Sequence, residues 1–238
     1  PGDMFIANDP YHGGGNHLPD IVIAAPAFAG EKLVGWIANI AHHSDIGGKV
    51  PGSTSGDADS LFQEGIRIPV IRIRERGQLI PSVLDLLLDN TRVPQEREGD
   101  LTAQMSANLI GVQRIQEAYQ RYGDDLEACM KELVAYSERR VRAVVSTLPD
   151  GEYTYTDYVD GCGDKYPDPL PIRVKVTVAG DSLTFDFTGT AQQIKAPINV
   201  PYPCTKAAVF FSVKALMGDD IPANEGINRA VKIIAPKG

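Results

Sequence analysis

The hydrophobic residues in the first part of the chain come in short runs separated by glycine, proline and polar residues. Two apolar runs cover 21–28 and 32–41, and a short loop containing glycine joins them. This arrangement is typical of a β-hairpin. A later run over 66–74 alternates between apolar and charged residues from Ile71 onward, which predicts one more strand. We therefore expect residues 1–80 to be rich in β-structure.

After residue 80 the apolar residues are spaced three and four apart, which is the period of an α-helix. One long helix is expected to begin at Pro94, and a break at Gly123-Asp124 separates it from a second helix. The apolar stripe of the first helix consists of Leu101, Met105, Leu109, Val112, Ile115 and Tyr119. Two helices with so short a break between them predict a helical hairpin.

An alternation of period two returns after Gly151. The segments 172–178 and 183–187 both alternate, and a Gly-Asp turn lies between them, which predicts a second β-hairpin. The order of elements predicts an α+β fold, with mixed β-sheet lobes and the helical hairpin inserted between them. The expected divisions are a β-rich lobe over 1–80, a helical segment over 81–148 and a second β/α lobe over 149–238 that continues beyond the chain end.

Composition excludes several classes of protein. The chain has 238 residues, of which 43% are hydrophobic, and this is an ordinary globular composition. The formal net charge of -8 argues against a nucleic-acid partner. No apolar stretch approaches the roughly 18 residues of a membrane span, so we expect no membrane association. The 3 cysteines are far apart, which is typical of reduced thiols in a cytoplasmic protein.

All 4 histidines fall between residues 12 and 43, close to aspartates and glycines. His17 and Asp20 precede the first predicted strand, while His42 and His43 end the next one. In a hairpin these two strand ends are adjacent. Two imidazoles and one carboxylate suit Zn, Mn or Fe(II) and leave positions open for water or substrate. Successive strand residues point to opposite faces, so only one of His42 and His43 is an easy ligand.

Two other interpretations of this region are open. Each histidine could serve only as a hydrogen-bonding residue near a turn. The run Gly13-Gly14-Gly15 could cradle a phosphate group, but it lacks the Gly-Lys-Ser/Thr ending of a P-loop. Glycines here and at 47 and 48 would also let the backbone approach a metal site closely.

An ordered set of motifs over most of the chain resembles the B-subunit family of ATP-dependent hydantoinases and 5-oxoprolinases, which is related to acetone carboxylase. The motifs are Asn8-Asp9-Pro10-Tyr11, His17-Leu18-Pro19-Asp20, Ala41-His42-His43-Ser44-Asp45-Ile46-Gly47-Gly48 and Phe62-Gln63-Glu64-Gly65-Ile66-Arg67-Ile68-Pro69. The resemblance implies that the chain is the N-terminal to middle fragment of a longer subunit.

The resemblance also implies a division of labour within a hetero-oligomer. A partner of the hydantoinase A type binds ATP and phosphorylates a cyclic amide, and the B-type chain then opens the ring of hydantoin, N-methylhydantoin or 5-oxoproline. The family's ligands for a divalent metal ion (Zn, Mn or Fe) correspond here to His17, Asp20 and His42. The alternatives are a subunit of an ATP-dependent ketone carboxylase and a non-catalytic structural fragment. Ligand groups more than about 6 Å apart would favour the structural fragment.

Opening a cyclic amide requires a proton for the leaving nitrogen, and a general acid must lie within hydrogen-bond reach of it. His43, Asp45 and Glu64 are the candidates. Each has an alternative role. His43 could orient a metal ligand, Asp45 could accept from His42 or cap the turn at 46–48, and Glu64 could pair with Arg67.

Overall fold

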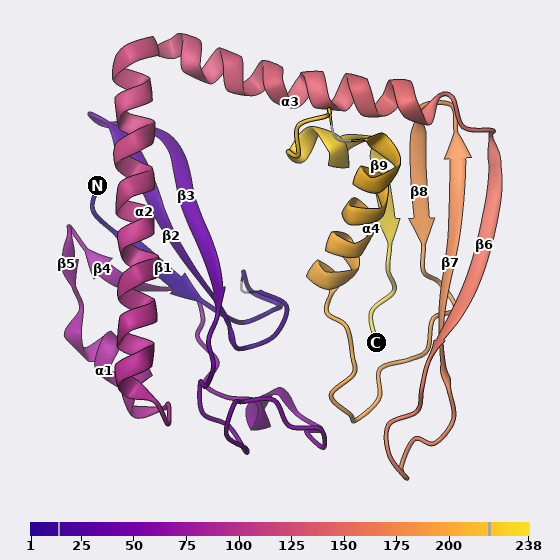
Figure 1. Ribbon diagram of the computed structural model, residues 1–238, viewed down its shortest axis with the longest axis horizontal. Coiled ribbons are helices and arrows are strands. Elements are labelled where there is room, and N and C mark those ends of the chain that lie inside the picture. The colour runs from indigo at the N-terminus through magenta and orange to yellow at the C-terminus, as the bar shows by residue number, and fades with distance from the viewer. Residues whose placement is uncertain (14, 219) are drawn as a thin grey trace. The chain divides into compact units, whose positions relative to one another are not determined.

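The fold is α+β, which confirms the predicted class. The structure is a computed structural model, and it describes residues 1–13, 15–218 and 220–238 (Figure 1). Gly14, one of the glycines noted above, lies outside the described residues. The contacts divide the chain into two compact units: Pro1–Glu127 with Lys195–Pro197, and Ala128–Ile194 with Ile198–Gly238.

The first unit contains a sheet of 5 strands in the order β3-β2-β1-β4-β5. The strands are β1 (Met4–Ala7), β2 (Asp20–Ala29), β3 (Lys32–His42), β4 (Ile71–Glu75) and β5 (Gln78–Leu79). The predicted hairpin is confirmed as the antiparallel pair β2–β3. The central strand β1 was not predicted, since four residues are too few to display an alternation.

The strand expected over 66–74 begins only at Ile71. The reason lies in the side chain of Asn8, whose amide nitrogen donates to the carbonyl oxygen of Ile66 and whose amide oxygen accepts from the nitrogen of Ile68. These backbone groups are satisfied by a side chain instead of a neighbouring strand, and the segment remains a loop. This loop includes Glu64 and follows a short 3₁₀ helix at Leu61–Gln63.

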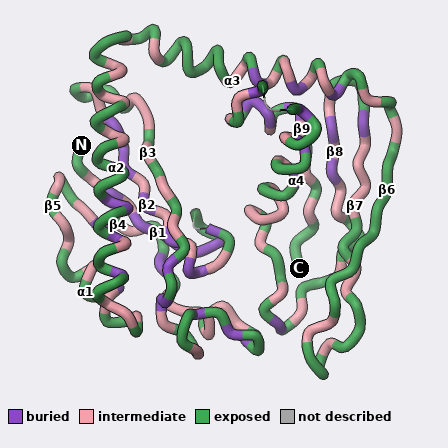
Figure 2. The backbone as a smooth tube through the Cα atoms, in the orientation of Figure 1, coloured by how far each residue is buried: buried purple, intermediate pink, exposed green. Residues whose placement is uncertain are grey.

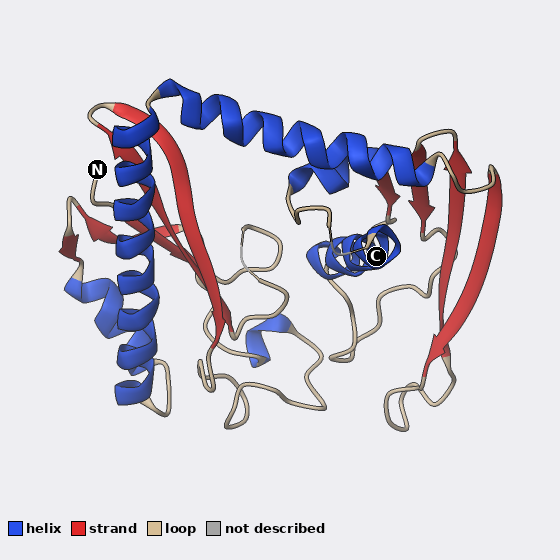
Figure 3. Cartoon of the chain, turned by 45° about the horizontal axis from the view of Figure 1, so that its top comes forward, coloured by secondary structure: helices blue, strands red, loops and turns tan. Residues whose placement is uncertain are grey.

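Two helices cover this sheet, α1 (Pro81–Asp89) and α2 (Pro94–Tyr122). Figure 3 shows α2 running along one face of the sheet, where it contacts β2 and β3. Leu101 and Met105 of α2 join the core formed by Ile6, Ile23 and Ile73 of the strands. The buried face of α2 also includes polar residues, namely Arg97, Gln104 and Asn108.

The second unit contains a sheet of 4 strands in the order β6-β7-β8-β9. Its elements are α3 (Asp124–Val145), β6 (Gly151–Val159), β7 (Leu170–Ala179), β8 (Ser182–Asp186), α4 (Tyr202–Met217), a 3₁₀ helix (Glu225–Ala230) and β9 (Val231–Ile234). The predicted second hairpin is confirmed as β7–β8, and β9 pairs with β8 in parallel. Figure 2 shows that β6 is exposed along its length, whereas β8 contributes Leu183 and Phe185 to the core.

The two long helices follow one another in the chain, but the predicted helical hairpin is not a packing unit, because the helices belong to different cores. Leu101 of α2 packs with the first sheet, while Val141 and Val145 of α3 pack with the second. The ranges 1–80, 81–148 and 149–238 therefore describe changes in secondary structure and not the packing units. No helix in the described part of the chain has the length and apolar character needed to cross a membrane.

Candidate metal centre

The three predicted ligands meet where β2 begins and β3 ends. Asp20 is the first residue of β2, His42 is the last of β3, and the two are register partners in the antiparallel ladder. Nε2 of His17 lies 3.2 Å from Oδ1 of Asp20, and the rings of His17 and His42 have centroids 4.9 Å apart. One ligand atom from each of the three lies within 4.8 Å of the others. This separation is inside the bound of about 6 Å set above.

The donor set suits a divalent cation. Two imidazole nitrogens and one carboxylate oxygen are ligands that Zn, Mn and Fe(II) accept, and three protein ligands leave coordination positions for other groups. The side chain of His17 is 39% exposed and that of Asp20 is 15% exposed, so the site is open to solvent. The residues therefore fit the metal that the resemblance implies.

The loop before β2 places Asp20 and His17 with respect to one another. The backbone nitrogen of Asn16 donates to Oδ2 of Asp20 at 3.1 Å, and the nitrogen of Asp20 donates to the carbonyl oxygen of His17. Leu18 is fully buried and anchors the loop in the core. A Cβ atom on Gly15 would lie 2.3 Å from Cβ of Asp20, so only glycine permits this approach. The carboxylate is thus held by backbone contacts before any cation binds.

Asn8 joins this loop to the segment that contains Glu64. Its amide nitrogen donates both to the carbonyl oxygen of Leu18 at 2.8 Å and to that of Ile66 at 2.9 Å. Asn8 is fully buried, so these contacts are shielded from water. The side chain of Asn8 therefore links the loop that contains His17 to the loop that contains Glu64.

Glu64 is the candidate acid that lies next to the metal ligands. Burial raises the pKa of its carboxyl group, and the nearby His17 opposes this in part. Arg67, which the sequence offered as a partner for Glu64, instead lies 3.6 Å from Asp9 and stacks over the ring of Phe62. Glu64 is thus a partly buried carboxyl group beside His17 that retains its proton to a higher pH than usual.

His43 points away from the ligands, as the alternation along a strand requires. It is fully buried, and its Nε2 lies 2.9 Å from Oε1 of Gln104 on α2. Burial lowers the pKa of His43, although the contact with Gln104 opposes this. A side chain with no exposed surface cannot touch a substrate, so the geometry disfavours His43 as the proton donor. Its contact with Gln104 supports the end of β3 beside His42 and does not orient a ligand side chain directly.

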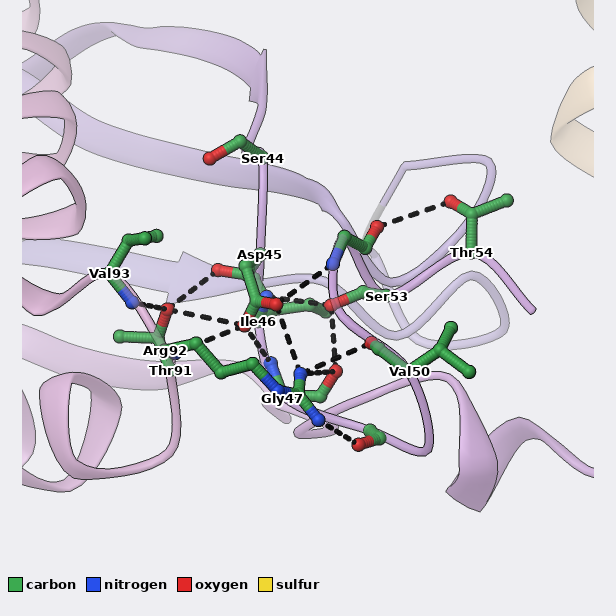
Figure 4. A network of polar contacts seen from close by, with 12 residues as sticks. Ser44, Asp45, Ile46, Gly47, Val50, Ser53, Thr54, Thr91, Arg92 and Val93 are labelled. Atoms are coloured by element: carbon green, nitrogen blue, oxygen red, sulfur yellow. Dashed lines mark hydrogen bonds and ion pairs between the residues drawn. The ribbon is translucent and has the colours of Figure 1, made fainter.

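Asp45 is occupied by the turn that follows β3 (Figure 4). Its carboxylate accepts from the backbone nitrogens of Gly47 and Gly52, both at 2.9 Å, and from the backbone and guanidinium of Arg92. Burial alone would raise the pKa of Asp45, but these hydrogen bonds lower it to about 2. A carboxylate so strongly held in its charged form is a poor proton donor near neutral pH. The geometry favours the alternative in which Asp45 caps the turn.

Comparison with known proteins identifies the family. The sequence profile described as hydantoinase B/oxoprolinase matches residues 1–238. The chain belongs to this family. The B-type chain of a putative D-/L-hydantoinase from Pseudomonas sp. (strain NS671) is 39% identical over 250 residues, which cover 100% of this chain and 42% of that protein. The beta chain of the caprolactamase from Pseudomonas jessenii is 33% identical over 245 residues, and the match covers 100% of this chain and 41% of that protein.

Solved structures agree with this assignment. The ATP-dependent caprolactamase from Pseudomonas jessenii matches with a TM-score of 0.92 and 32% identity, over 99% of this chain and 40% of that one. A nucleotide-free acetone carboxylase matches with a TM-score of 0.85 over 96% of this chain and 32% of that one, but at 19% identity the likeness is one of fold alone. The chain therefore spans about two fifths of the hydantoinase and caprolactamase chains that it matches.

Three residues that shape the centre of this hydantoinase B/oxoprolinase chain were not predicted from the sequence. Gln104 lies on the buried stripe of α2 between Leu101 and Met105, where a polar residue is a signal of an internal contact. Asn8 was noted only as part of a motif. Arg92 had no signal in the sequence, because the four hydrogen bonds of its side chain to the turn exist only in the folded chain.

Proposed function

We propose that this chain is part of the metal-bearing subunit of an ATP-dependent cyclic-amide hydrolase. A partner of the hydantoinase A type would bind ATP and phosphorylate the carbonyl oxygen of the cyclic amide. The metal-bearing subunit would then open the ring of a hydantoin, an N-methylhydantoin, 5-oxoproline or a related lactam. The observation that carries the proposal is the convergence of His17, Asp20 and His42 at the paired ends of β2 and β3.

The residues of the chain have separate tasks in this reaction. His17, Asp20 and His42 would hold the cation, and Asn16 fixes the second carboxylate oxygen of Asp20 through its backbone nitrogen. A divalent cation held there supplies Lewis acidity, which activates a water molecule near neutral pH and polarises the substrate. The water oxygen adds to the phosphorylated ring carbon, the ring C–N bond breaks, and the nitrogen takes up a proton. The acyl phosphate that results is then hydrolysed by a second water molecule to a carboxylate and inorganic phosphate.

Glu64 is the residue we assign to protonation of the leaving nitrogen. Burial raises the pKa of its carboxyl group, which favours the protonated form that a general acid needs. It lies close enough to His17 for the two side chains to interact. The carboxylate formed on proton transfer would be favoured by the positive charge of a cation held at the centre, so Glu64 can give up its proton there and regain it from solvent.

Two further functions share the same scaffold. A ketone carboxylase is compatible with the fold, which acetone carboxylase also has. A purely structural fragment is disfavoured, because the three ligand groups lie within 4.8 Å of one another. A hydrolase consumes a cyclic amide without bicarbonate, whereas a carboxylase requires both a ketone and bicarbonate.

The decisive assay uses the full-length subunit together with its ATP-binding partner. Hydantoin, N-methylhydantoin, 5-oxoproline and caprolactam are each supplied with ATP, and ring-opened product is measured. A second set of reactions contains acetone or acetophenone with ATP and bicarbonate. Product from the first set alone supports the hydrolase, and product from the second set alone identifies the carboxylase. Under the proposal, His17→Ala abolishes ring opening while ATP hydrolysis by the partner continues.

A further inference from the structure

A small cavity lies in the core of the first unit, next to the end of β3. Its volume is about 10 Å³, which is room for one water molecule. Most of its lining is apolar, but His43, Asp45, Thr91 and Arg97 also border it. The cavity therefore combines the size of a single hydration site with polar groups on its wall.

Arg97 of α2 brings donors to this cavity that lack acceptors. Its side chain is only 3% exposed. Nη2 is fully engaged with Ser44, Glu96 and Asp100, at 2.8 to 3.0 Å. Nε and Nη1 have no hydrogen-bond partner among the described residues. Buried donors left unpaired cost folding free energy, so an acceptor is expected beside them.

His43 brings the complementary group. Gln104 donates through Nε2 to the carbonyl oxygen of Ile21 and to Oδ1 of Asn39, both at 2.9 Å. These two acceptors fix the orientation of the amide, and its oxygen therefore faces His43. Nε2 of His43 must carry the proton in that contact, which makes Nδ1 of the neutral ring an acceptor. Nδ1 is buried, and no described group donates to it.

We propose that one ordered water molecule occupies this cavity, accepts a hydrogen bond from Arg97 and donates one to Nδ1 of His43. Water fits because it is both donor and acceptor, whereas an anion could not donate to Nδ1. The acidic residues Glu96 and Asp100 already balance the charge of Arg97, so no charged ligand is required. Arg97, the water, His43 and Gln104 then form one continuous buried unit.

This unit holds the strand ends that carry two metal ligands. Gln104 binds the carbonyl oxygen of Ile21, the neighbour of Asp20, and also binds His43, the neighbour of His42. Gln104 is therefore a positioning residue for the metal centre, an assignment that rests on the proposed function. It touches neither the ligand atoms nor a substrate, and it acts through the backbone of β2 and β3.

Crystallography of the unmodified full-length subunit tests the hydration site without reference to activity. At a resolution that resolves individual waters, one peak is expected within hydrogen-bond distance of both Nδ1 of His43 and Nε or Nη1 of Arg97. A direct contact between Arg97 and Nδ1 would overturn this part of the inference. So would a cavity without density and with both groups still unpaired.

Titration of the full-length subunit with Co²⁺ tests the positioning role, with the absorption spectrum of the bound ion as readout. Gln104→Met is expected to weaken Co²⁺ binding by about 10- to 100-fold and to alter the spectrum, as for loss of groups that support metal ligands. Asn108→Leu is the matched control, because Asn108 bonds Ile23 and Asn39 one turn further along α2 without touching His43. The control should keep both affinity and spectrum.

The outcomes separate this inference from the proposed function. If the unmodified protein takes up no Co²⁺, the proposed metal centre itself fails. If it takes up Co²⁺ and Gln104→Met does so equally well with the same spectrum, the positioning role fails while the proposed function stands. Equal losses of Co²⁺ affinity in Gln104→Met and Asn108→Leu would show that Gln104 only stabilises the fold and does not position the metal ligands.

Discussion

Asp20 and His42 are direct partners across the β2–β3 ladder, although they lie at opposite ends of the hairpin sequence. Directly opposed residues of an antiparallel pair project to the same face, with Cβ atoms about 4.5 to 5.5 Å apart. The strand register therefore brings a carboxylate beside an imidazole. His17 completes the group from the preceding loop, 3.2 Å from Asp20.

Removal of one imidazole should remove the metal. We expect His17→Ala in the full-length subunit to lose most of its bound divalent metal, because one of three protein ligands disappears. The fold should persist, since the side chain is 39% exposed. Elemental analysis after purification without chelators is the measurement. His12→Ala is the control, because His12 contacts Asp9 and lies outside the ligand group; equal metal in both variants would contradict the site.

A methyl group at position 15 should disturb Asp20 without adding backbone strain. The Cβ of Gly15→Ala would lie 2.3 Å from Cβ of Asp20, so the carboxylate must move. We expect metal affinity to fall by about 10- to 100-fold, as for other losses of support around a ligand. Titration with Mn²⁺ measures the effect. Gly35→Ala, where an added Cβ meets nothing within 4 Å, should bind as the unmodified protein does.

Asp45 should make stability depend on pH in the acid range. Its pKa of about 2 lies below the ordinary 3.8. The charged carboxylate therefore stabilises the folded state fully above about pH 4, and this stabilisation is lost as the pH falls toward 2. The shift corresponds to about 2 kcal/mol. We expect Asp45→Asn to lower the free energy of unfolding by about that amount at pH 7, measured with urea. A variant whose stability matched the unmodified protein at pH 7 would show that the turn does not depend on this charge.

Glu64 should control the alkaline side of the activity profile. As a general acid it must be protonated, so turnover should decline as the pH rises through its raised pKa. We expect Glu64→Gln to lower kcat by about 10²- to 10⁴-fold and to lose that decline, while bound metal stays unchanged. Steady-state rates across pH, with metal analysis alongside, measure both effects. Glu31→Gln, on the exposed turn between β2 and β3, is the control; an unaltered profile in Glu64→Gln would exclude the assigned role.

Local pattern was enough for the two hairpins and for the grouping of the candidate metal ligands. The alternation in 21–28 and 32–41 predicted the hairpin, and placing His17 and Asp20 before one strand and His42 after the next followed from it. The ligand group could be anticipated because a hairpin fixes which ends of its strands are adjacent. The extent of the loop after Glu64 could not be anticipated, because it depends on hydrogen bonds from Asn8, far away in the chain.

The roles of the candidate acids were open in the sequence, since a histidine, an aspartate and a glutamate are all plausible proton donors. Burial distinguishes them in the structure. His43 has no exposed surface, the charged form of Asp45 is held by the turn and Arg92, and Glu64 is half-buried beside His17. The environment of each group, and not its residue type, sets its pKa.

The sequence by itself determined the α+β class, the two hairpins and the residue types of the candidate metal site, because these follow from the period of the side chains and the chemistry of neighbouring residues. Only the tertiary structure decided that α2 and α3 serve different cores, that Gln104 supports the strand ends and that Arg92 closes the turn at Asp45. Those relationships join residues far apart in the chain, and such contacts form only when the burial of apolar faces has set the positions of the helices and sheets.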